Sequence, residues 1–222
     1  MRSKPIGPLS ALALLVGLAG PACSLLSPQK DETRYAVLAS VDELPGGAAP
    51  APAPAADARV GLGPVALPEY LRRTEMVSRE EGTKIVISRT ERWAEPLDRA
   101  IVRVLAVDLE RALGVARIMP HPWYPSDRPD VQIEIEIARC EREGERVVVA
   151  ARWTVRDLRE SGAAPIERES RIERAAATSG GASTALALSQ ALAELCREIA
   201  AAGGSAAGGQ GVKASTPPRS RS

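Results

Sequence analysis

Phenylalanine is missing from the 222-residue chain, and histidine occurs once, as His121. A catalytic centre built on several histidines is therefore excluded. The sequence has 29 basic and 28 acidic residues, and its arginines are interspersed with glutamates instead of gathering in one stretch. Such mixed charge is typical of a solvated, ion-paired surface. It argues against a nucleic-acid-binding protein, which needs a surplus of positive charge on one face.

Long hydrophobic runs are scarce as well. Leu9–Gly20 is apolar and follows the positive residues Arg2 and Lys4. The run is too short to span a bilayer, which takes about 20 apolar residues, but it has the three-part form of a secretory signal peptide. We therefore expect residues 1–22 to be removed on export, which would expose the remaining cysteines to an oxidising compartment.

Cys23 follows the small residues at the end of this signal. The boundary resembles the bacterial lipobox, an aliphatic residue and two small residues before the cysteine, although Gly20 stands in the aliphatic position. We predict that Cys23 is lipidated, and several acyl chains would hold the protein firmly on a membrane. The alternative is ordinary signal cleavage at the same bond, which would give a soluble exported protein.

The rest of the chain divides by composition. The first part, residues 23–43, is expected to be a tether and a first strand, and 44–58 is a Pro/Ala-rich linker. Residues 59–202 are long enough for one domain with its own core. A Gly/Ser/Pro-rich tail, residues 203–222, is predicted to be disordered.

Hydrophobic periodicity predicts an α+β fold of a single domain, with an antiparallel sheet and two main helices packed on one face. One helix follows Pro96 and stops at Gly114, and the other contains Leu188–Ile199. The Pro165–Glu173 strand is highly charged, as expected at a sheet edge. The other expected strands are 35–39, 60–67, 76–79, 84–88, 131–137 and 147–155.

Two cysteines remain once Cys23 is lipidated. Cys140 lies near the end of an expected strand, and Cys196 lies on the apolar face of the last helix. A disulfide between them is one candidate, provided that the Cα atoms approach within about 7 Å. Two separate buried thiols are the alternative.

No pattern indicates catalysis, a cofactor or a metal. The carboxyl groups of Glu134 and Glu136 share one strand face, but they alternate with isoleucines and are expected to face solvent. His121 has no cysteine or acidic cluster at metal-ligand spacing. The Gly61–Gly63 segment is not followed by a helix, so it does not indicate a phosphate-binding loop. The sequence therefore predicts a non-enzymatic protein.

Five short segments, taken in order, resemble those of the ABC-type transport auxiliary lipoproteins, the family of the PqiC subunit of MCE-type lipid transport systems. The resemblance covers residues 23–202. The chain departs from the family pattern in its irregular lipobox, its long Pro/Ala linker and its basic tail. The segments are Cys23-Ser24-Leu25-Leu26, Tyr35-Ala36-Val37-Leu38, Val60–Leu71 with its Leu-Pro-x-Tyr-Leu ending, Glu91–Leu97 with its Arg-Trp-Ala-Glu-Pro core, and Ala151-Arg152-Trp153.

This resemblance implies a non-catalytic accessory subunit that faces the periplasm. It would be lipid-anchored in the outer membrane, which Ser24 after the cysteine favours. Its partners would be an MCE-domain protein and the permease and ATPase of an ABC transporter that moves phospholipid between the membranes, with no cofactor. Tyr70 and Trp93 are candidate partner contacts, and a homo-oligomer is left open. The alternative is a soluble periplasmic binding or interaction module not tied to a transporter.

Overall fold

Alternating apolar and polar residues build the central strand, β6 (Val131–Glu143), in the computed structural model. Its buried positions alternate with half-buried and exposed ones through the first half of the strand, as the sequence predicts. Through a turn at Gly144, β7 (Arg146–Asp157) returns antiparallel along all of β6, and β8 (Ile166–Ala175) pairs antiparallel with β7 at the sheet edge. The structure describes residues 31–46, 58–159 and 162–207.

Two strands share the other edge of β6. β2 (Val60–Ala66) runs parallel to its first half, and β3 (Glu75–Glu80) runs parallel to its end. β4 (Lys84–Trp93) forms an antiparallel hairpin with β3. The short strands β1 (Arg34–Ala36) and β5 (Ile118–Pro120) add parallel to β4 and β2.

The α+β class is confirmed, and the described residues from Thr33 onward form one compact unit. Within the described residues the sheet has eight strands and is mixed, whereas the sequence predicted antiparallel pairing. The parallel pairing of β2 with β6 has a simple cause. A hairpin and a helix separate these two strands in the chain, and a crossover of that length brings the chain back in the same direction.

The helix predicted after Pro96 is α2 (Leu97–Leu113). Gly114 ends it in the left-handed conformation, with φ of 63°, a backbone geometry that suits glycine. The prediction of this helix and of its stop is confirmed.

The last helix, α3 (Gly181–Ala207), is longer than the apolar periodicity indicated. It passes through residue 203, where the sequence placed the start of a tail. A Cβ added to Gly203 would lie 3.2 Å from Cγ1 of Val155, so this residue packs closely on β7. The fold therefore continues past the predicted domain boundary at residue 202.

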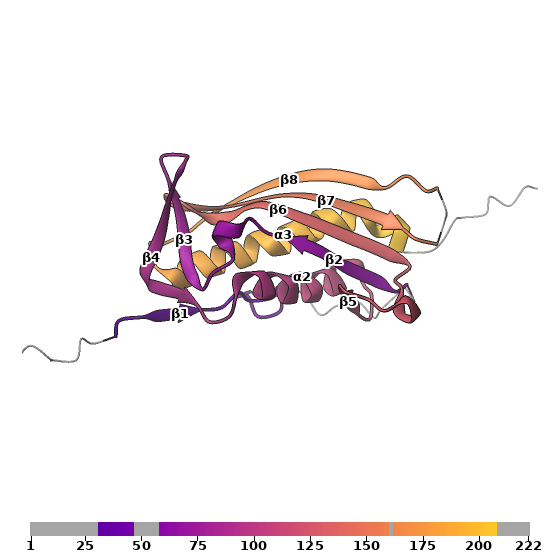
Figure 1. Ribbon diagram of the computed structural model, residues 1–222, viewed down its shortest axis with the longest axis horizontal. Helices are drawn as coiled ribbons and strands as arrows, with labels where there is room; N and C mark the ends of the chain where they lie inside the picture. The colour runs from indigo at the N-terminus through magenta and orange to yellow at the C-terminus, as the bar shows by residue number, and fades with distance from the viewer. Residues whose placement is uncertain (1–30, 47–57, 160–161, 208–222) are drawn as a thin grey trace, which may run out of the picture. The chain divides into compact units, whose positions relative to one another are not determined.

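Both helices cover the same face of the sheet (Figure 1). α3 packs on β7 and β8, α2 packs on β2 and β5, and the two helices pack on each other. The core fills the space between the two layers. Its largest fully buried side chains are Leu38, Leu62, Leu71, Leu97, Ile101, Leu105, Leu109, Ile118, Ile133, Ile135, Ile137 and Leu188.

The Gly61–Gly63 segment has a packing role. A Cβ on Gly61 would lie 2.5 Å from Cζ2 of Trp123 and 2.7 Å from Cγ of Pro129, closer than carbon atoms approach. The loop that contains the short 3₁₀ helix η4 (Pro125–Asp127) thus rests directly on the β2 backbone. This close approach explains why glycine is suited to the position.

Candidate functional site

Tyr70, a predicted partner contact, lies on the 3₁₀ helix η3 (Glu69–Leu71). Its hydroxyl donates to Oε2 of Glu141 at 3.1 Å and accepts from Nη2 of Arg79 at 2.9 Å. Glu141 lies on the face of β6 opposite to Cys140, because neighbouring residues of a strand point to opposite faces. The hydroxyl therefore joins η3 to β3 and β6.

The Glu141 carboxylate is the centre of this cluster, and its side chain is 0% exposed. Oε1 accepts from Nε of Arg79 and Nε of Arg139, both at 2.8 Å, and Oε2 also accepts from the Cys140 N–H at 2.9 Å. Burial is the largest single influence and raises the pKa of Glu141. The hydrogen bonds from the two arginines and the backbone together outweigh it and lower that pKa. The carboxyl group therefore stays ionised.

The two predicted contact residues differ in where they lie. The Tyr70 ring is half-buried and its hydroxyl serves the cluster, with burial and the Glu141 carboxylate raising its pKa. Direct contact between Tyr70 and a partner stays a prediction. Trp93 is only 4% exposed and belongs to the core. Little of the indole is therefore accessible in this structure, and direct contact between Trp93 and a partner also stays a prediction.

Trp153, the last residue of the Ala-x-Trp segment, is also a core residue. Its indole N–H donates to Oγ of Ser170 on β8 at 2.9 Å, so its polar atom is satisfied inside the fold. The tryptophans of these two segments therefore contribute packing.

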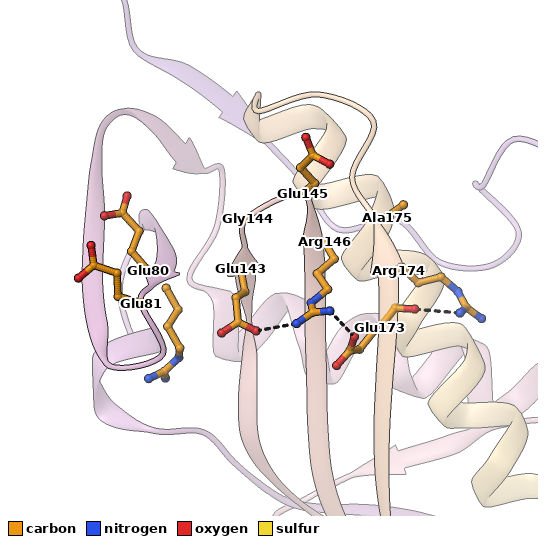
Figure 2. Close-up of a pocket in the computed structure, with 10 residues that line it drawn as sticks. Glu80, Glu81, Glu143, Gly144, Glu145, Arg146, Glu173, Arg174 and Ala175 are labelled. Atoms are coloured by element: carbon orange, nitrogen blue, oxygen red, sulfur yellow. Dashed lines mark hydrogen bonds and ion pairs between the residues drawn. The ribbon is translucent and has the colours of Figure 1, made fainter.

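A charged hollow of about 840 Å³ lies beside the Glu141 cluster, and Arg79 reaches both. Figure 2 shows how it forms where the β3–β4 hairpin, the β6–β7 hairpin and the end of β8 come together. The residues that line it are Arg79, Glu80, Glu81, Glu143, Gly144, Glu145, Arg146, Glu173, Arg174 and Ala175.

Ion pairs neutralise much of this hollow. The Arg146 guanidinium joins Glu143 at 3.6 Å and Glu173 at 3.2 Å (Figure 2). Five glutamates against three arginines leave an acidic surplus in the lining. Across the described ranges, no group of three or more His, Cys, Asp and Glu side chains is placed to hold a metal ion. The hollow is therefore an open surface lined by ion pairs.

The residues first weighed for chemistry lie apart from this hollow. Glu136 is exposed on β6, where it pairs with Arg152 at 3.5 Å, and its neighbour Glu134 is half-buried on the same strand. His121 is exposed in the loop after β5 and meets the edge of the Trp123 ring, with centroids 5.1 Å apart. Neither place brings together an acid, a base and a nucleophile.

The segment after β1 is fastened across both helices, and we call residues 38–43 the strap. The Ala39 N–H donates to Oγ of Ser189 on α3 at 2.9 Å. On the α2 side, the Leu38 carbonyl accepts from Arg103 at 3.0 Å, and Asp42 pairs with Arg111. These contacts fix the chain just after the segment that leads from Cys23.

Asp108 of α2 binds the backbone of the strap. Its Oδ1 accepts from the Val41 N–H at 2.7 Å, whereas its Oδ2 is buried without a hydrogen-bond partner. Burial, together with the nearby Glu43 carboxylate, raises the pKa of Asp108 to about 6, although the bond from Val41 opposes this.

The two cysteines are both free and fully buried, so the candidate disulfide is not formed. The reason is that Cys140, on β6, lies level with the start of α3, whereas Cys196 lies much further along that helix. Arg142, two residues after Cys140, reaches Oγ1 of Thr184 at 3.4 Å, near the start of the helix. Cys196 lies twelve residues later, which is about 18 Å further along a helix. It donates to the Leu105 carbonyl on α2 at 3.9 Å instead.

Burial raises the pKa of both thiols, to about 12 for Cys140 and well above its ordinary value for Cys196. Two thiols held in this state behave as small apolar groups. Cys23, the predicted lipidation site, lies outside the described residues. Within the described part of the chain, no helix has the length and apolar character needed to cross a membrane.

Comparison with known proteins agrees with this arrangement. The sequence model of the family described as "ABC-type transport auxiliary lipoprotein component" matches residues 43–200. A crystal structure of an uncharacterized protein is similar with a TM-score of 0.60 and 19% identity, over 76% of this chain and 97% of that one. Protein XCC0632 from Xanthomonas campestris is similar with a TM-score of 0.58 and 15% identity, over 74% and 90%. A search of curated proteins gives no significant match.

Proposed function

Because the chain belongs to the ABC-type transport auxiliary lipoprotein family, we propose that it is a lipid-anchored, non-catalytic accessory subunit of an MCE-type phospholipid transport system. The strap is the observation that carries this proposal. It fastens the chain to α2 and α3 a short distance after Cys23. Arg34 is the eleventh residue after Cys23, and eleven residue steps span at most about 40 Å. An acyl anchor would therefore hold the folded part near a membrane surface.

The proposed location is the outer membrane, with the domain in the periplasm. Ser24 after the anchor cysteine supports this choice, and so does the export signal at residues 1–22. The proposed partners are the MCE-domain protein and, through it, the permease and ATPase. The open charged hollow and the half-buried Tyr70 offer surfaces for such docking. No cofactor and no nucleic acid enter this function.

The anchor is tested by replacing Cys23 with serine. We expect Cys23→Ser protein to appear in the soluble periplasmic fraction and to incorporate no labelled fatty acid, because the thiol that carries the lipid is gone. Wild-type protein should fractionate with the outer membrane. Cys140→Ser is the matched control and should keep the label, since the Cys140 thiol is buried in the core. Unlabelled, soluble wild-type protein would favour the alternative of a soluble periplasmic module.

The partner is tested separately, by crosslinking in intact cells followed by purification of the lipoprotein. We expect an MCE-domain protein in the crosslinked product, identified by mass spectrometry, and increased sensitivity of a deletion strain to detergents. A lipid-labelled protein that recovers no MCE-domain partner and whose loss leaves the envelope unchanged would contradict the transport role but keep the anchor.

A further inference from the structure

A second hollow, of about 560 Å³, lies along the solvent side of α2, and we call it the α2 groove. It lies beside the end of β2, the end of β5 and the residue that follows η3. The apolar residues that line it are Val65, Val102, Ala106, Val107 and Pro120, and the charged ones are Arg72, Asp98, Arg99 and Arg103. A volume of this size lies within the range of small-molecule sites, roughly 300–1,000 Å³.

Along α2 the lining begins with charged residues, among which Val102 also lies, and ends with apolar ones. On α2 the charged residues Asp98, Arg99 and Arg103 come first and the apolar pair Ala106 and Val107 comes last. β5, whose last residue Pro120 also lines the groove, lies by the C-terminal end of α2 (Figure 1). From residue 99 to residue 107 the helix rises about 12 Å. On its α2 side the groove thus has its charged residues toward the start of the helix and the apolar pair Ala106 and Val107 beyond them.

Arginine predominates among the charged residues that line the groove. Three arginines line it against one aspartate. Arg72 and Arg103 have carboxylate partners, Glu69 at 3.6 Å and Glu95, whereas the exposed Arg99 side chain has no ion pair among the residues that the structure describes. The first turn of α2 adds the positive end of the helix dipole at the same place. An anionic group can therefore pair with Arg99 at this end of α2.

From this charge arrangement we infer that the α2 groove binds a single-chain anionic amphiphile, with its acyl chain on the apolar residues and its head group by Arg99. The inference rests on the proposed function for its choice of a lipid as the occupant. The head group is a carboxylate or a phosphodiester, because both are singly charged anions that an arginine pairs with.

The test measures binding to the full mature chain carrying Cys23→Ser, which removes the protein's own acyl chains. The probes are oleate, 1-oleoyl-lysophosphatidylglycerol and uncharged 1-oleoylglycerol, each below its micelle concentration and followed by displacement of a fluorescent fatty acid. We expect saturable binding of both anions and weaker binding of 1-oleoylglycerol. The two anionic probes separate a free fatty acid from a lysophospholipid as the preferred occupant.

Two variants locate the site. Val107→Glu places a carboxylate on the apolar part and should weaken oleate at least about tenfold. Arg99→Gln, at an exposed position, should weaken both anions roughly two- to fivefold and leave 1-oleoylglycerol unchanged. Ile87→Glu is the matched control, the same change at an exposed apolar residue of β4 outside the groove, and should bind as the parent does.

Each contrary result has its own meaning. Absence of saturable binding in the parent protein, or equal binding in the parent, Val107→Glu and Arg99→Gln, would overturn the inference. If sedimentation instead shows that the parent self-associates and Val107→Glu abolishes this without amphiphile binding, the groove is an interface between copies and the inference is wrong. An MCE crosslink that persists in any of these cases leaves the proposed function in place.

Discussion

Replacement of Glu141 by alanine is expected to lower the free energy of unfolding by about 3–5 kcal/mol at pH 7. The substitution removes the acceptor of Arg79, Arg139 and the Tyr70 hydroxyl at once. Both arginine side chains are at least four-fifths buried, so each would lose a close carboxylate in a place that water reaches poorly, and Arg139 would keep only its longer ion pair with Glu143 at 3.5 Å. Urea unfolding followed by circular dichroism measures the change.

Glu136→Ala is the matched control. The residue lies on the same strand, but its ion pair with Arg152 is exposed, and such pairs contribute less than about 1 kcal/mol. A similar cost for both substitutions would contradict the special role of the buried carboxylate.

The pH dependence gives a second check on Glu141. Its pKa is lowered in the folded protein, so the stability that its ionised form contributes is present above the unfolded value of about 4.3 and is lost as the pH falls through the folded value. The difference between wild type and Glu141→Ala should therefore be largest near neutral pH and shrink in acid. A difference that does not change with pH would contradict this account.

Much of the fold could be predicted because its signals are local. The β6 alternation, the α2 periodicity and the glycine that ends α2 each lie within one segment of sequence. Which strands are neighbours could not be predicted in this way. β2 and β6 lie about 70 residues apart in the chain, with the hairpin and α2 between them, and pair in parallel. The shortest strands, β1 and β5, also depend on such distant partners.

The candidate site was harder to predict, and the bulge in β6 shows why. The register of β6 against β7 shifts between Ile137 and Arg139, which moves Cys140 onto the core side and Glu141 onto the other side. Strict alternation from Ile137 would have placed Arg139 and Glu141 in the core. Charged residues at the two positions that continued alternation would place in the core were the available signal of an irregularity there.

The resemblance to the family directed attention to Tyr70 and Trp93, but it could not separate contact from packing. The Tyr70 hydroxyl binds residues 9 and 71 positions away in the sequence, and the Trp93 indole is enclosed by the core. Asp108 gave no sequence signal beyond a polar residue in an otherwise apolar stripe of α2. Its partner, the Val41 N–H, comes from the strap and lies 67 positions away.

Replacement of Asp108 by asparagine is expected to stabilise the protein at pH 7.5 relative to wild type and to leave the two nearly equal at pH 4. Asparagine is neutral at every pH, as the aspartic acid is when protonated, and its amide oxygen can accept from Val41. Because the folded pKa of Asp108 is raised from 3.8 to about 6, the folded state holds a proton that the unfolded chain releases between these values. The contribution of this group to the free energy of unfolding is therefore greatest below the unfolded pKa, and it is lost as the pH rises through the folded pKa.

Two pKa units correspond to about 3 kcal/mol, which sets the expected size of the gain in Asp108→Asn between pH 4 and pH 7.5. The comparison is between variant and wild type at each pH, so the titration of Glu141 and other shared groups cancels. Urea unfolding at the two pH values measures it, and pH 4 serves as the internal control. A gain of the same size at both pH values would instead mean that asparagine merely packs better. A loss at pH 7.5 would mean that the ionised carboxylate stabilises the strap, because the bond to Val41 would then outweigh the cost of burying its charge.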